Sequence, residues 1–222
     1  KVQWTFGENS GTRKIEALLT DTGGNTSIQE STKVFVSSFD SENTITDFII
    51  VVEQRDDVTI DEGPPPSIVL VPSIFEVVYL GTNNGQFWVL EPFSRLMYTL
   101  SDIEIVKLIE FNDVILIFTY DELSDVGSVY RHDIVEATLL NTFSSSLSKT
   151  TSVAIFDDML YIGLENGELW SYSGTVFAQV SLTTTESIST LFGDEAYLYI
   201  GFTNSSDILL YNGTSFITAS VE

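Results

Sequence analysis

The sequence contains three closely similar segments: YLGTNNGQFW at residues 79–88, YIGLENGELW at residues 161–170 and YIGFTN at residues 199–204. The glycines that they share are Gly81, Gly163 and Gly201, so the segments are about 40 residues apart or about twice that distance. A repeat of this length, made of short strands, is typical of a β-propeller in which each repeat forms one four-stranded blade. The repeat therefore predicts the fold, but it contains no group that identifies an activity.

Four such units follow one another in the second part of the chain, and we expect propeller blades at about 68–100, 105–143, 152–182 and 187–221. Near-continuous apolar runs such as residues 114–118 indicate strands buried on both faces, as in a blade that lies between two others. The shared glycine is expected where backbones crowd. Trp88 and Trp170 are expected to pack between blades rather than to form a ligand platform.

The repeat resembles the propeller repeats of bacterial two-component sensors and related extracellular propellers, whose unit reads roughly Leu-Tyr-Ile-Gly-Thr-x-x-Gly-Leu-x-x-Tyr. The resemblance is carried by the Tyr-x-Gly segments quoted above, covers the four units, and is clear in three of them. It implies a propeller fold and does not imply an activity.

Residues 1–62 follow a different pattern, and the Pro-rich segment 63–67 predicts a semi-rigid linker between this region and the propeller. Apolar and polar residues alternate as in the half-exposed strands of an Ig-like sandwich. WTFGEN at residues 4–9 and LLTDTGGNT at residues 18–26 resemble motifs of PKD domains. The resemblance implies a partial PKD-like β-sandwich at the surface of a cell or virion, or in a secreted protein.

The PKD family's first strands have no counterpart here, so we expect the chain to begin inside that domain. Residues 46–53 and 57–60 are predicted to be two further strands, which we leave unassigned to either domain. The expected fold class is therefore all-β, with a propeller of four recognisable four-stranded blades behind a partial Ig-like sandwich and its extra strands.

The composition excludes several kinds of partner and cofactor. Thirty-two acidic residues against nine basic ones give a formal net charge of −23, which disfavours nucleic acid and anionic membrane surfaces. The chain has no cysteine, so it has no disulfide, thiolate metal site or Fe–S cluster. It has no apolar run of about 18 residues, so we expect no direct insertion into a membrane.

Few residues are candidates for chemistry. The single histidine, His132, follows a predicted strand, and we interpret it as an exposed turn residue. One histidine without cysteine disfavours a zinc or copper site. The pairs Asn112-Asp113, Asp157-Asp158 and Asp194-Glu195 occupy the same turn in successive units, which favours turn chemistry over calcium binding or catalysis. We therefore assign no catalytic, cofactor-binding or metal-binding residue and expect no cofactor.

These observations favour a non-enzymatic structural, adhesion or assembly module displayed outside the cell, or on a virion or its tail. Its partner would be a protein or glycan at a surface, or other copies of the same chain. One alternative is a carbohydrate-active propeller enzyme, which requires carboxylates that converge in one pocket with raised pKa values. Another is the periplasmic sensor propeller of a signalling receptor.

Overall fold

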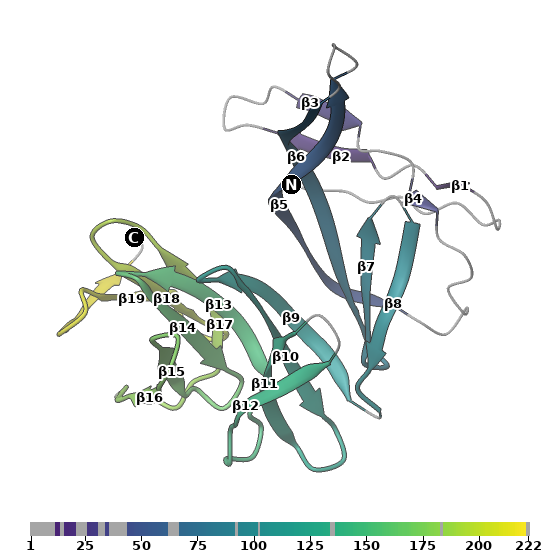
Figure 1. Cartoon of the computed structure of the whole chain (residues 1–222). Helices are drawn as coiled ribbons and strands as arrows, with labels where there is room; N and C mark the ends of the chain where they lie inside the picture. The colour runs from purple at the N-terminus through teal and green to yellow at the C-terminus, as the bar shows by residue number, and fades with distance from the viewer. Residues whose placement is uncertain are drawn as a thin grey trace. The chain divides into compact units, whose positions relative to one another are not determined.

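The computed structural model describes residues 12–13, 16–20, 26–30, 34–35, 44–61, 67–91, 93–101, 103–133, 136–182 and 184–220. These residues form strands and turns, with no helix among them (Figure 1). It follows that this part of the chain contains no helix long and apolar enough to cross a membrane. Two compact units are present: residues 1–43, 50–79 and 88–96, and residues 44–49, 80–87 and 97–222.

The first unit begins with short strands in two antiparallel pairs. Strand β1 (Thr12–Arg13) pairs with β4 (Val34–Phe35), and β2 (Glu16–Thr20) pairs with β3 (Thr26–Glu30). The PKD-like motif at residues 4–9 lies outside the described residues, and so does the centre of the second motif. The PKD-like sandwich therefore stays a prediction.

The rest of the chain forms four antiparallel sheets of four strands, which we number blades 1 to 4. In each sheet, strands that are consecutive in sequence are neighbours in space. Blade 2 comprises β9 (Glu104–Phe111), β10 (Val114–Asp121), β11 (Val126–His132) and β12 (Ala137–Thr142). Blade 3 comprises β13 (Thr150–Phe156), β14 (Met159–Leu164), β15 (Leu169–Tyr172) and β16 (Phe177–Val180). Blade 4 comprises β17 (Ile188–Gly193), β18 (Leu198–Phe202), β19 (Asp207–Tyr211) and β20 (Phe216–Ser220). The predicted all-β fold with four-stranded blades is confirmed.

Blade 1 differs from its prediction. It comprises β5 (Ile45–Asp61), β6 (Ser67–Thr82), β7 (Gln86–Glu91) and β8 (Phe93–Thr99). Its first strand thus comes from the region that we assigned to neither domain, where two strands were predicted and one is found. The predicted linker 63–67 lies, apart from Ser67, outside the described residues, and the strands on either side of it, β5 and β6, are neighbours in one sheet.

Pro72 lies within the single long strand β6. Strand β7 has six residues and turns back directly from the end of β6, so it reaches only the last part of β6. Pro72 lies beyond that part, where its missing N–H removes no bond to β7.

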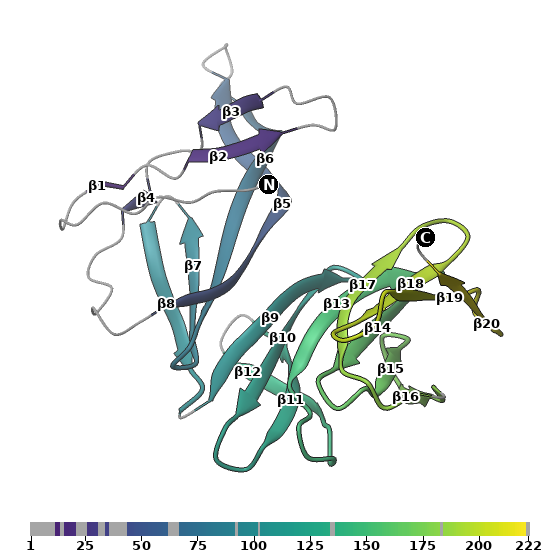
Figure 2. The same cartoon turned by 180° about the vertical axis from the view of Figure 1, so that it is seen from behind.

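The first strands of blades 2, 3 and 4 lie side by side. Strand β13 contacts both β9 and β17, and the three sheets follow one another through the second unit in both views (Figures 1 and 2). One apolar core, which includes Phe118 and Leu160, lies between blades 2 and 3. A second core, which includes Tyr161 and Leu198, lies between blades 3 and 4.

The pairing of the first and second strands shifts at the same place in blades 2, 3 and 4. Ile105, Thr150 and Ile188 are each followed by a register shift toward the second strand. Just beyond the shift, the second strand carries Phe118, Gly163 and Gly201. Because the irregularity recurs, residues of different blades can be compared position by position. In blade 1 the shared motif aligns Gly81 with Gly163. The backbone N–H of Asn83 donates to the carbonyl of Thr44 in blade 1, as that of Thr203 donates to Ser187 in blade 4. The residues that follow the two acceptors, Ile45 and Ile188, are therefore equivalent.

Candidate protein-binding surface

His132 is not the exposed turn residue that we predicted. It is the last residue of β11 and is half-buried. Its Nδ1 lies 3.0 Å from the hydroxyl of Tyr98, and its ring centroid lies 4.9 Å from that of Phe87. Burial, followed by the charge of Asp133, raises the pKa of Tyr98 above its usual range. His132 therefore belongs to aromatic packing between blades 1 and 2.

The predicted acidic turns have the conformation that turn chemistry requires. Asn112 and Asp113 have φ angles of 53° and 59°, and Asp157 and Asp158 have φ angles of 50° and 56°. Two successive positive φ angles are the mark of a type I′ hairpin turn, in which Asn and Asp are favoured. The interpretation of these pairs as turn residues is confirmed.

Asp194 fixes the longer turn of blade 4. Its carboxylate accepts bonds from the backbone N–H groups of Ala196 and Tyr197, at 2.7 and 2.8 Å, and from the hydroxyl of Tyr199. These bonds lower the pKa of Asp194. Among the described residues, no group of three or more His, Cys, Asp or Glu side chains is placed to hold a metal ion.

The two tryptophans lie in strands. Trp170 in β15 is half-buried, and its ring centroid lies 5.4 Å from that of Phe143, which directly follows the last strand of blade 2. Its Nε1 donates to Glu168 Oε2 at 2.9 Å. The prediction that Trp170 packs between blades is confirmed, and Trp88 lies half-buried in β7.

An exposed leucine stands out in the loop between β10 and β11. Leu123 is 92% exposed, although the backbone around it is fixed by hydrogen bonds. The carboxylate of Asp121 accepts from the N–H of Leu123 at 2.9 Å and from the hydroxyl of Ser124 at 2.6 Å. At the other end of the loop, Asp125 has a φ of 60° and accepts a bond from Tyr120. The loop therefore presents an apolar side chain on a rigid support.

A second exposed leucine is tied to the first loop. Leu147, in the segment that connects blades 2 and 3, is 49% exposed and has a φ of 54°. A positive φ is uncommon for a side chain of this size. The N–H of Leu147 donates to Asp125 Oδ2 at 3.0 Å, and its carbonyl accepts from the N–H of Asn166 at 3.0 Å. Loops from two blades thus hold Leu147 in a strained conformation.

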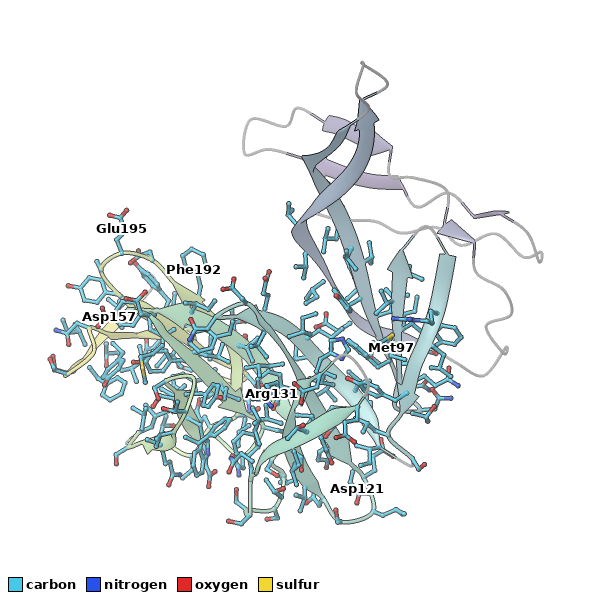
Figure 3. All side chains as sticks on the ribbon, viewed as in Figure 1. Met97, Asp121, Arg131, Asp157, Phe192 and Glu195 are labelled. Carbon is cyan, nitrogen blue, oxygen red and sulfur yellow. The ribbon has the colours of Figure 1, made fainter. Side chains whose placement is uncertain are left out.

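Three carboxylates of these loops act on Tyr120, which lies close to the loop of Leu123. The bond to Asp125, burial, and the charges of Asp125, Glu165 and Glu122 raise the pKa of Tyr120 to about 12. The nearby cation, Lys149, is engaged by Glu104 at 2.7 Å and lies 5.2 Å from the centre of the Tyr120 ring. We call Leu123, Leu147, Glu122, Asp125 and Glu165 the leucine rim. In Figure 3, Asp121 marks this rim, well apart from Asp157 and Glu195 at the acidic turns.

Sequence reasoning missed the leucine rim. One signal was available, because Leu123 is an apolar residue inside the acidic loop Asp121–Asp125, where turn residues are usually polar. Leu147 gave no such signal, since its exposure depends on the conformation of the segment around it. The bond between the two loops joins residues 22 positions apart, and the repeat pattern does not specify it.

Comparison with known proteins supports the fold alone. No protein-family model and no curated protein matches the sequence. Among solved structures, the chain is similar to BBS1N in complex with ARL6DN (TM-score 0.56, 12% identity, 94% of this chain and 64% of that one). It is also similar to Sqt1 of Saccharomyces cerevisiae (TM-score 0.55, 12% identity, 93% and 54%) and to BamB from Moraxella catarrhalis (TM-score 0.53, 14% identity, 98% and 59%). The chain thus spans less than two thirds of these three propeller chains, and its own fold is a β-propeller.

Proposed function

We propose that this chain is a non-enzymatic protein-binding propeller module, and that the leucine rim is its binding surface. The observation that carries the proposal is the pair of exposed leucines on loops that hydrogen bonds hold rigid. A similar propeller, BBS1N, was solved in complex with another protein, ARL6DN, which accords with a binding role.

The geometry favours binding because the loop that carries Leu123 is already ordered in the free protein. Asp121 and Asp125 already fix the loop that carries Leu123, so complex formation costs little additional loop entropy. Burial of such an exposed leucine in a pocket of the partner removes apolar surface from water and stabilises the complex.

The charges of the rim indicate the chemistry of the partner. Glu122, Asp125 and Glu165 attract basic side chains, and the net charge of −23 repels acidic ones. The proposed partner is therefore a protein segment with apolar and basic residues. Electrostatic attraction of this kind weakens as salt is added.

The described carboxylates give the enzyme alternative little support. A general acid needs a raised pKa, whereas hydrogen bonds lower the pKa of Asp121, Asp133 and Asp194. Asp47 has a raised pKa because of burial, but its carboxylate accepts a bond from the N–H of Leu108 in the next blade. We place the module at a cell or virion surface, as the PKD resemblance implies.

Affinity capture with matched variants tests the proposed function. The wild-type chain, Leu123→Ser and a control, Val176→Ser, are immobilised and exposed to the same cell extract at low and high salt. Val176 is 62% exposed but lies in the turn before β16, away from the rim loops. We expect basic proteins that bind the wild type and the control, are lost with Leu123→Ser, and elute with salt. If every captured protein binds Leu123→Ser as well as the wild type, the rim is not the binding surface.

A further inference from the structure

The open face of blade 4 carries the same docking groups that join the other blades. The first of these groups is a hydroxyl that donates to the next blade. Thr46 in blade 1 donates to the carbonyl of Ile105 in blade 2. At the same position of blade 3, Thr151 donates to the carbonyl of Ile188 in blade 4. The acceptor in both interfaces is the isoleucine that precedes the register shift.

The second docking group is an oxygen that accepts a backbone N–H from the next blade. Asp47 accepts from Leu108 at 2.7 Å, and Ser152 accepts from Leu191 at 2.9 Å. Each acceptor directly follows the donating threonine, and each donor lies three residues after the isoleucine. The two interfaces therefore use the same bonds at the same positions.

The third docking group is the shared glycine, which makes room for the isoleucine. A Cβ atom on Gly163 would lie 2.5 Å from Ile188 Cγ2, and a Cβ atom on Gly81 would overlap Ile105 in the same way. The absence of a side chain thus creates a socket that the next blade fills. The crowding that we predicted at these glycines is present, but the neighbour is a side chain rather than backbone.

The interface between blades 2 and 3 shows that these groups belong together. There the glycine is replaced by Phe118 and the isoleucine by Thr150, so a large and a small residue change places. Val106 and Lys107 stand where the hydroxyl and the accepting oxygen would be. Where the socket is absent, the two bonding groups are absent too.

Blade 4 has the complete set, and none of the other described blades supplies a neighbour at its glycine. Ser189 and Thr190 occupy the two bonding positions, and both are exposed. A Cβ atom on Gly201 would find no neighbour closer than 3.7 Å, and the nearest atoms belong to Ser189 and Thr190 of the same blade.

Apolar side chains surround this socket. Phe192 is 61% exposed, and its counterpart in blade 3, Ala154, is buried between blades. Ile217 on the outer strand is 48% exposed. Figure 3 shows Phe192 at the margin of the second unit. This face has the polarity of a blade interface rather than of a solvent face.

Blade 1 carries the matching half. Ile45 stands where Ile105 and Ile188 stand in the docked blades, and it precedes the same pair of polar residues, Thr46 and Asp47. Those two side chains bond to blade 2. Ile45 is half-buried and has the position of Ile105 and Ile188, whose side chains face Gly81 and Gly163 of the preceding blade. The described blades therefore include a socket on blade 4 and the residue that fits it on blade 1.

We propose that blade 4 of one copy docks head-to-tail onto blade 1 of a second copy. Ile45 of the second copy enters the Gly201 socket, and its carbonyl accepts the Ser189 hydroxyl. This is a heterologous contact, so it gives a closed ring or an open chain of copies. It involves other blades than the leucine rim, so either proposal can fail without the other.

Analytical ultracentrifugation over a range of concentrations tests the contact, with Gly201→Val and the control Val176→Ser. We expect the wild type and the control to form species of twice the 24.6 kDa chain mass or more. Their dissociation constants should be at least about tenfold lower than that of Gly201→Val. Salt should strengthen the association, because each copy carries a formal charge of −23. A wild type that stays monomeric in high salt, or equal association of Gly201→Val, would overturn the proposal.

Cross-linking distinguishes contact between copies from contact within one chain. The protein has no cysteine, so single variants Thr44→Cys and Gly201→Cys can be mixed under mild oxidation. We expect a disulfide-linked pair that contains one of each variant, and no such pair when Val176→Cys replaces Gly201→Cys. A double variant Thr44→Cys, Gly201→Cys that closes on itself and forms no linked pair would contradict docking between copies.

Discussion

The outward faces of blades 3 and 4 have the same groups in different surroundings. On blade 3, Thr151, Ser152 and Gly163 engage the next blade, and the apolar side chains around them are buried. On blade 4, Ser189, Thr190 and Gly201 have the same positions, and Phe192 beside them is exposed. The comparison teaches that the repeat specifies an interface as well as four strands. Each prediction below changes one position on a closed face and one position on the open face.

The largest effect is expected when a buried aromatic side chain is removed from a closed interface. Phe118 is completely buried between blades 2 and 3. Phe118→Ala should lower the free energy of unfolding by about 3–5 kcal/mol, because the cavity adds to the lost burial. Phe192→Ala, on the open face, should change it by less than about 0.5 kcal/mol. Urea unfolding followed by tryptophan fluorescence measures both values, and similar losses would show that the open face is packed.

A smaller effect is expected from the hydroxyl that joins two blades. Thr151 donates to Gly163 O at 3.0 Å as well as to Ile188. Thr151→Val should cost about 1–2 kcal/mol, because the removal of a donor leaves buried carbonyl groups without their bond. Ser189→Ala removes the equivalent hydroxyl where no second blade is bound and should cost close to nothing. Equal losses in thermal unfolding at low protein concentration would contradict this difference.

The smallest effect concerns pH. Burial raises the pKa of Asp47 above 3.8 in the folded state. The folded protein therefore holds this proton more tightly than the unfolded chain, so the contribution of Asp47 to stability falls as pH rises through the raised pKa. Asp47→Asn keeps an oxygen that can accept from Leu108 and lacks this titration.

The free energy of unfolding, measured between pH 3 and pH 7, checks the sign. Relative to the wild type, Asp47→Asn should gain stability as the pH rises. Thr190→Ala is the control on the open face and should give a difference that does not depend on pH. A relative loss for Asp47→Asn toward pH 7 would mean that attraction to Lys107 outweighs burial at this carboxylate.

Sequence periodicity was sufficient to predict the blades, because the Tyr-x-Gly segments and Asn-Gly turns determine strand order locally. It failed at blade 1, whose first strand precedes the proline segment and is recognised only by its pairing. Pro72 does not end β6, since a proline disrupts a strand only where its N–H would be bonded on that side.

The functional surface was less accessible from sequence than the fold. The interpretation of His132 was wrong because nothing near it in the sequence reveals that Phe87 and Tyr98 pack on it. The roles of Thr151 and Ser152 were equally hidden, because each depends on the register between two blades. Local patterns predict strands and turns, whereas contacts between blades depend on residues some 40 positions apart.

The most direct test of the shared interface is the unfolding free energy of Gly163→Val and Gly201→Val, measured at a concentration where the wild type is monomeric. Gly163→Val should lose about 1–3 kcal/mol or more, because its side chain meets Ile188. Gly201→Val should lose nothing or gain slightly, since valine favours a strand and meets no neighbouring blade. Equal losses for the two variants would contradict the account, because they would mean that Gly201 already accommodates a packed side chain.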